Sequence, residues 1–363
     1  MTGLRTLAAL VLVVAAFGCK RTPREGEGAA TGLKNPANRR EVVALAEAAL
    51  ACPWDDARGI DDAKCPAVGK WTKSPILLEP SSDATLLAML ADARPPVRWL
   101  AAKSLDAFER PARVDATSAA RLLAAAEREP SAPVARALGL AVGAIDLGAT
   151  ALAPKVQAVL EGGARVELRA GIASSVVRRN PSFFPVVMKL ARTATEPDLQ
   201  SSSTWGLRFA APEHQKEVQA LWLERADSAD PDVSDEVYTS CSVYLECEPI
   251  AATLLGKLEA RKRMPLFVFA FLRVLISEPI HASLRTRAIE LANRVVDDEA
   301  QEDGVRALTL DSLHRCGVPS AMVLARKYEG SSLLFLRERA KEILERGPLD
   351  GGADAGVIPS RAP

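Results

Sequence analysis

Aromatic residues and histidine are scarce in this chain of 363 residues. Phe, Trp and Tyr together make up 5%, and only three histidines occur. The apolar residues, 48% of the chain, are mostly Ala, Leu and Val. Ala and Leu suit close-packed helices, whereas strands favour aromatic and β-branched residues. The composition therefore predicts an all-α protein.

The chain also lacks an excess of charge of either sign. Lys plus Arg and Asp plus Glu number 46 each. No overall electrostatic field would attract nucleic acid, so we expect none as a partner. Charged residues at 25% and apolar residues at 48% provide a large core and exclude disorder as the main state. The length allows two or three domains or one elongated repeat array.

Long hydrophobic runs are absent except near the N-terminus. Arg5 is followed by eleven apolar residues, Leu7 to Phe17, and then by Gly18 and Cys19. About 20 apolar residues are needed to cross a bilayer, so this run is too short for a lasting span. A charged start, a short apolar run and small residues are typical of a signal peptide, here residues 1–18.

The end of this run, Ala16-Phe17-Gly18-Cys19, resembles the bacterial lipobox. The resemblance implies that Cys19 is lipid-modified and becomes the new N-terminus, which would hold the protein at a membrane. It departs from the family pattern at Ala16 and Phe17, so cleavage after Gly18 with a free Cys19 stays open. In well-studied Gram-negative lipoproteins the absence of Asp after the cysteine directs sorting to the outer membrane, which Lys20 fits.

Low apolar content characterises both segments that flank the body of the chain. Residues 19–38 contain the lipidation site and scattered Gly and Pro, so we expect a flexible linker. Residues 347–363 contain GPLDGGADAG and are expected to be a disordered tail.

Between these segments the apolar residues recur at helical spacing, i, i+3, i+4, i+7. Successive helices with this pattern start about 34 residues apart. Their starting residues are Val97, Val134, Leu168, Leu199, Val233, Phe267, Val305 and Ser332.

A further amphipathic stretch with its own start signal separates consecutive members of this series. Pro in the first turn and Ser, Thr, Asp or Asn at the cap mark helix starts. The signals are Ser82-Asp83, Asp115 to Thr117, Thr150, Asn180-Pro181, Pro212, Pro249, Ser283 and Pro319. Each repeat is therefore predicted to be a helical hairpin. Small residues at matching positions, Ala101, Ala141, Gly171 and Gly206, would let neighbouring helices approach closely.

The stretch RPPVRWLAAKSL, Arg94 to Leu105, resembles the second helix of HEAT repeats. Weaker similarity is found at Pro231 to Val233 and Gly304 to Leu313. The resemblance implies an α-solenoid of stacked hairpins, HEAT/armadillo-like, with about eight repeats over residues 81–346. The family's inter-repeat Asp and Arg ladder is largely missing, and the only candidates at the Arg position are Arg98, Arg169 and Arg306.

Five cysteines follow Cys19, and an exported chain permits disulfides. Cys52 and Cys65 bracket an irregular stretch within residues 39–80, where we expect an N-terminal helix and a cap. A bridge between them is our first expectation. Cys241 and Cys247 form a second candidate pair, with a buried core thiol as the alternative for Cys241. Cys316 occupies a core position and is expected to be a buried free thiol.

No motif for catalysis or for a cofactor is found. The three histidines, His214, His281 and His314, lie apart, and we expect a surface His314 beside a core Cys316. The carboxylates Asp55, Asp56, Asp61 and Asp62 could attract Ca²⁺, but the spacing of a calcium loop is absent. We therefore expect no metal, no cofactor and no catalytic residue.

Two runs of like charge are candidate docking sites. One is cationic, Arg261 to Arg263, and the other comprises Asp297, Asp298, Glu299, Glu302 and Asp303. Both also have a simpler explanation, because cations suit helix C-termini and anions suit N-termini.

These features together predict a lipid-anchored cell-envelope scaffold that binds a protein or peptide partner on its repeat surface. Two alternatives stay open. One is a HEAT-like enzyme or lyase component with an unrecognised site, and the other is a purely structural envelope lipoprotein.

Overall fold

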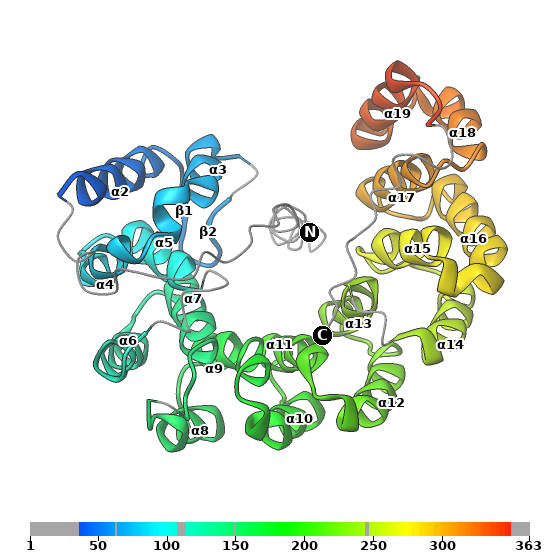
Figure 1. Cartoon of the computed structure of the whole chain (residues 1–363). Coiled ribbons are helices and arrows are strands. Elements are labelled where there is room, and N and C mark those ends of the chain that lie inside the picture. The colour runs from blue at the N-terminus through cyan, green and yellow to red at the C-terminus, as the bar shows by residue number, and fades with distance from the viewer. Residues whose placement is uncertain (1–35, 62–63, 107–113, 149, 244–246, 350–363) are drawn as a thin grey trace. The chain divides into compact units, whose positions relative to one another are not determined.

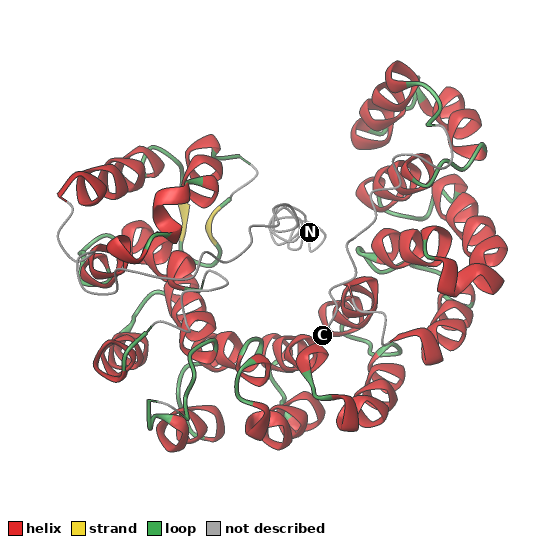
Figure 2. Cartoon of the chain, in the orientation of Figure 1, coloured by secondary structure: helices red, strands yellow, loops and turns green. Residues whose placement is uncertain are grey.

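The computed structural model describes residues 36–61, 64–106, 114–148, 150–243 and 247–349. Cys19, the signal peptide and nearly all of the predicted linker and tail lie outside these residues. The described part is almost entirely helical, with eighteen α-helices and one pair of two-residue strands (Figure 2). The predicted all-α class is confirmed. None of the described helices has the length and apolar character needed to cross a membrane.

The chain divides into two compact units, Met1–Ala211 and Pro212–Pro363. Unit 1 contains ten α-helices among its described residues (Figure 1). They are α2 (Pro36–Ala49), α3 (Pro66–Lys73), α4 (Asp83–Met89), α5 (Pro95–Leu105), α6 (Ala116–Arg128), α7 (Ala132–Gly143), α8 (Ala153–Glu161), α9 (Val166–Ala173), α10 (Phe184–Thr193) and α11 (Pro197–Gly206).

Unit 2 contributes the other eight α-helices of the described chain (Figure 1). They are α12 (Gln215–Arg225), α13 (Pro231–Val243), α14 (Glu248–Glu259), α15 (Val268–Ser277), α16 (Arg285–Asp297), α17 (Asp303–Arg315), α18 (Ser320–Tyr328) and α19 (Leu334–Arg346). From α4 onward the even-numbered helices are called first helices and the odd-numbered helices second helices. Each predicted starting residue of the 34-residue series lies within or next to a second helix.

Proline and capping residues set these boundaries, as the sequence predicts. Asp115 caps α6, because its side chain accepts a hydrogen bond from the Ser118 N–H. Proline stands in the first turn of α5, α7 and α11. Because a proline there removes only an N–H that would have no helical partner, it starts the helix without loss.

The second helices of unit 1 form a row. Helix α7 packs against α5 and α9, and α9 packs against α11, while α6, α8 and α10 lie on one side of the row (Figure 1). Glycines make this contact unusually close. A Cβ atom on Gly171 would lie 2.2 Å from the Arg136 carbonyl oxygen, and one on Gly206 would lie 2.0 Å from the Ala173 carbonyl oxygen. The prediction of close approach at Gly171 and Gly206 is confirmed.

Residues 36–78 cover the N-terminal end of this row. Helix α2 packs against α3 and α5, and the Trp71 indole N–H donates to Ser104 Oγ of α5 at 2.8 Å. Strands β1 (Trp54–Asp55) and β2 (Gly59–Ile60) form an antiparallel pair. Gly59 has φ +84° and lies against the Trp99 ring, where a Cβ would be 3.0 Å away.

The second helices of unit 2 also form a row, α13, α15, α17 and α19 in order, but larger side chains fill it. The Tyr238 ring of α13 meets the Phe271 ring of α15 edge to face, with centroids 5.5 Å apart. Both side chains are buried. Phe269 is buried as well, so this unit obtains its core from aromatic and branched side chains.

Ion pairs link the first helices of unit 2. In each pair a cation on one first helix meets an acid at or just after the end of the preceding first helix. The pairs are Lys257 with Asp227, Arg287 with Glu259 at 2.6 Å, and Lys327 with Asp297 at 2.9 Å. These three pairs form a ladder between successive first helices, which we did not predict from the sequence.

Candidate functional site

The fourth residue of several second helices reaches back to the end of the preceding helix. Arg98 of α5 donates from Nη1 to the carbonyls of Asp92 and Ala93, at 2.9 and 3.0 Å. It also forms a two-pronged pair with Glu129, at 2.8 and 2.7 Å. A cation at carbonyls near a helix C-terminus satisfies acceptors that lack a helical partner.

Arg169 and Arg306 are also the fourth residues of their second helices, and each also donates to a carbonyl of the preceding helix. Arg169 Nε donates to the Leu160 carbonyl of α8 at 3.0 Å, and Arg306 Nε donates to the Val296 carbonyl of α16 at 2.8 Å. Arg306 is buried. The three arginines that the sequence singled out therefore share one structural role, which is to join the two helices of a hairpin.

Two further residues at this position were missed. Gln200 of α11 donates to the Ala194 carbonyl, and Arg337 of α19 donates to the Ser331 carbonyl, both at 3.3 Å. A hydrogen-bond donor of any type at the fourth residue of a second helix is the sequence feature that could have identified them. A search limited to arginine in a HEAT-like motif excluded Gln200 by residue type.

The row of second helices in unit 1 carries a polar link across three helices. Arg136 of α7 donates to Ser202 Oγ of α11 at 2.9 Å and pairs with Asp198 at 3.3 Å. Helix α9 lies against both α7 and α11, so the link crosses it. Leu140 of α7 and Trp205 of α11 are partly exposed.

Cations and aromatic rings gather near the C-terminal ends of these second helices. The Arg208 guanidinium lies 3.1 Å from the Trp205 ring centroid and 4.3 Å from that of Phe209. Lys103 Nζ lies 4.2 Å from the Trp99 ring centroid. Such contacts stabilise a cation over the face of an aromatic ring.

Asp106 ends α5 within reach of these cations. Burial raises the pKa of its carboxyl to about 7, although Arg178, Lys103 and Arg208 act in the opposite direction.

A shallow cavity of about 230 Å³ lies between α8, α9 and α10 of unit 1. Arg169, Lys189, Glu161 and Glu196 line it together with apolar side chains. Its two cations and two carboxylates balance, and Arg169 is already engaged with Leu160 and Glu196. The cavity thus contains no uncompensated charge for a small ion.

The described residues bring together no histidine and carboxylate set that could hold a metal ion. His281 is buried at a kink in the segment Pro279–Leu284, and burial lowers its pKa. His214 belongs to the short helical turn Pro212–His214. These histidines lie on separate elements.

The expectation of a surface His314 beside a core Cys316 is wrong. His314 is 2% exposed, and its Nε2 makes a 2.8 Å hydrogen bond with the Gly347 carbonyl just after α19. Cys316 follows the end of α17 and is half-buried rather than fully buried, although it is free as expected. Burial raises the pKa of its thiol to about 11, so it is a poor nucleophile at neutral pH.

The acidic residues of the Cys52–Cys65 segment make separate local contacts. Asp55 Oδ1 accepts from the backbone N–H groups of Ala57 and Arg58, and Asp56 Oδ1 accepts from the Trp54 indole. Asp61 pairs with Lys64 at 3.1 Å. Asp62 lies outside the described residues. The described carboxylates therefore do not converge on a common point.

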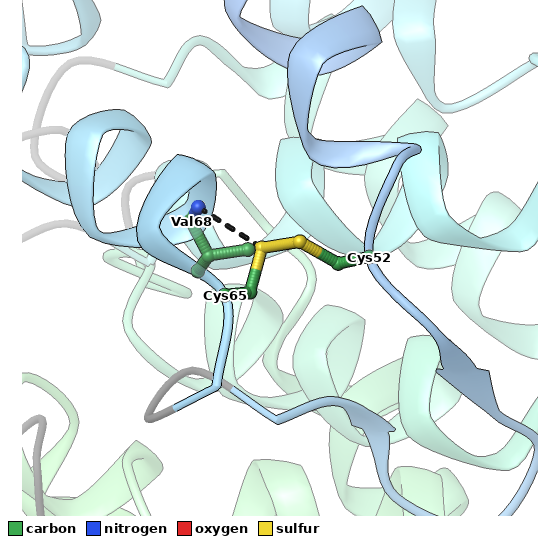
Figure 3. The surroundings of a disulfide bond; sticks show 3 residues. All are labelled: Cys52, Cys65 and Val68. Carbon is green, nitrogen blue, oxygen red and sulfur yellow. Dashed lines mark hydrogen bonds between the residues drawn. A yellow bond between two sulfur atoms is a disulfide. The ribbon is translucent and has the colours of Figure 1, made fainter.

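Both expected cysteine pairs lie at disulfide-bonding distance. The sulfur atoms of Cys52 and Cys65 are 1.97 Å apart, and those of Cys241 and Cys247 are 2.09 Å apart. Figure 3 shows the first pair, where Cys65 Sγ also accepts from the Val68 N–H at the start of α3. The second pair connects the end of α13 to the start of α14.

The cationic and acidic runs are neighbours in unit 2. Arg263 lies 3.9 Å from Glu302, and the Gln301 amide bonds to the backbone of Lys262 and Met264. Asp303 accepts from the N–H groups of Phe335 and Leu336 at the start of α19. Both runs thus have partners within the unit.

Comparison with protein-family models gave no match, and comparison with curated proteins gave none.

Proposed function

We propose that this protein is a lipid-anchored cell-envelope scaffold whose helical hairpins form a HEAT-like solenoid of about eight repeats. The observation that carries the proposal is the row of second helices within each unit. In both units each second helix packs against the next second helix, two elements along the chain. This pattern is characteristic of solenoids, in which each repeat contacts its neighbours.

A binding role follows from the composition of these rows. Stacked repeats present an extended surface on which a protein or peptide partner can lie. In unit 1 that surface includes the Arg136 link and the partly exposed Leu140 and Trp205. Aromatic and arginine side chains are favoured at protein interfaces, which supports a protein partner over a small molecule.

Export is supported by the cysteine chemistry. Two disulfides in one chain are typical of proteins outside the reducing cytosol. The signal peptide and Cys19 would supply the route and the lipid anchor. An outer-membrane position is the expectation from Lys20.

The anchor is tested by expressing the full chain in a Gram-negative host with an alkyne-labelled fatty acid. We expect labelled protein in the membrane fraction, and unlabelled, soluble protein for Cys19→Ser. Cys316→Ser is the matched control and should leave both label and location unchanged. An unlabelled wild-type protein in the soluble fraction would overturn the lipid anchor.

The binding surface is tested by photocrosslinking in the cell envelope. A photoreactive residue at Leu140, on the second-helix row, should capture a discrete partner. The same residue at Lys155, exposed on the first helix α8, is the control. Equal capture at both positions, or none at either, would contradict a partner on the row and favour a purely structural role.

A further inference from the structure

The loop between α14 and α15 in unit 2 is held by side chains from two other elements. Gln301, which precedes α17, accepts from the Met264 N–H at 2.9 Å and donates to the Lys262 carbonyl at 2.8 Å. These bonds fix the first half of the loop. Gln301 is buried, so its amide is shielded from competing water.

Asp235 of α13 fixes the second half of the loop. Its Oδ2 accepts from the Leu266 N–H at 3.2 Å. The side chain is 5% exposed, and its Oδ1 has no hydrogen-bond partner among the described residues. An ionised carboxylate in this position would be a buried charge with one oxygen unsatisfied, which is costly.

The charged groups around Asp235 do not compensate for this burial. Asp232 on the same helix and Glu302 before α17 both repel a negative charge there, while Arg261 attracts it. The Arg261 guanidinium is bonded to the Ala226 carbonyl and to Ser234 Oγ. Tyr238, also on α13, is neutral, because burial raises its pKa to about 12.

We propose that Asp235 is a proton-dependent latch for the loop between α14 and α15. The neutral carboxyl keeps the loop closed, and the ionised carboxylate favours an open loop in which water reaches both oxygens. Opening would uncover Pro265 and Phe267, which are buried in the closed loop. The proton thus controls access to apolar surface at the start of α15.

The direction of the pH effect follows from linkage. Burial raises the pKa of Asp235 to about 7 in the closed loop, whereas a solvated Asp titrates near pH ~4. The contribution of Asp235 to the stability of the closed loop is therefore at its maximum below the pKa of a solvated Asp. That stability falls by up to about tenfold per pH unit as the pH rises towards 7, and then levels off.

Hydrogen exchange of the full chain between pH 4.5 and 8.5 tests the latch, with rates corrected for the intrinsic pH dependence of exchange. We expect protection of the amides of Met264 and Leu266 to fall with rising pH in the wild type. In Asp235→Asn the carbonyl acceptor remains but cannot ionise, so protection should stay high throughout.

Two further variants separate titration from simple loss of structure. Glu299→Gln changes an exposed acid of the acidic run that also contains Glu302, and it should leave the pH dependence of protection unchanged. Glu302→Gln removes a repelling charge, which should move the profile to lower pH. A wild-type profile that is flat, or the same slope in Asp235→Asn, would overturn the latch. If Asp235→Asn does not fold, the latch is overturned by a Glu302→Gln variant whose pH dependence of protection is the same as that of the wild type.

Discussion

The second helices of unit 1 and unit 2 meet their neighbours in different ways. In unit 1, Gly171 and Gly206 bring backbones so close that a single Cβ would overlap a carbonyl oxygen. In unit 2, Gly304 of α17 has no such close backbone contact, and aromatic side chains fill the row instead. The same repeat length is thus compatible with two kinds of packing between second helices.

The ion pairs differ as well. Unit 2 links successive first helices by a ladder of three pairs. Unit 1 instead contains the buried pair of Arg98 and Glu129 and the Arg136 link along its second helices. The two units therefore place their ion pairs on different helices, along the second helices in unit 1 and between successive first helices in unit 2.

The strongest test of this comparison is Phe271→Ala in unit 2. Removing a buried aromatic ring that contacts Tyr238 should lower the free energy of unfolding by about 4 kcal/mol. Chemical denaturation followed by circular dichroism measures it. Phe335→Ala, at a position 57% exposed, is the control and should change stability little. Equal effects at both positions would contradict an aromatic core in unit 2.

Gly171→Ala is the corresponding test in unit 1. The added methyl group would meet the Arg136 carbonyl, so α7 and α9 must separate, at a cost of about 3 kcal/mol. Gly304→Ala is the matched control, because nothing lies within 4 Å of its Cβ position. That change should be neutral or stabilise by up to about 1 kcal/mol, the gain in helix propensity. Thermal unfolding of both variants measures the difference, and a neutral Gly171→Ala would refute backbone contact.

The smallest expected effect is at the ladder. Asp297 accepts from Lys327 Nζ and the Tyr328 hydroxyl, and these bonds outweigh burial and lower the pKa of its carboxyl. Its contribution is present above the ordinary Asp pKa and is lost as the pH falls through the lowered value. Asp297→Asn should cost only about 0.5 kcal/mol at pH 7, because the pair is exposed. The difference from wild type should shrink in acid, and a difference that grows there would exclude this explanation.

Residue types and their spacing were enough to place the helices. Asp115, Pro231 and Pro249 mark helix starts in the chain and in the structure alike, because capping and the proline ring act locally. The pair of Cys52 and Cys65 was likewise accessible, because the two residues bracket one irregular stretch. For Cys241 the sequence left a pair with Cys247 and a core thiol as alternatives. The shared role of Arg98, Arg169 and Arg306 was only partly predictable from the sequence. It depends on which carbonyls at the end of the preceding helix lie close to each arginine.

The burial of His314 could not be read from the chain. The sequence predicts a surface position on α17 for His314. In the structure its ring is hydrogen-bonded to the carbonyl of Gly347, which lies 33 residues later in the chain. The proximity of Arg263 to Glu302 and the grip of Asp235 on Leu266 have the same origin. Each contact joins residues that are separated in the chain by at least one whole helix.

The sequence by itself determined that the chain is helical and where each hairpin begins, and it identified two candidate cysteine pairs. These properties arise from neighbours along the chain, within a few turns of helix. Only the tertiary structure decided that glycines permit close backbone contact in unit 1 and that ion pairs link the first helices of unit 2. It also decided that Asp235 is buried, with one oxygen that has no partner among the described residues. Such features depend on the distance between helices, which is fixed by the packing of many side chains at once.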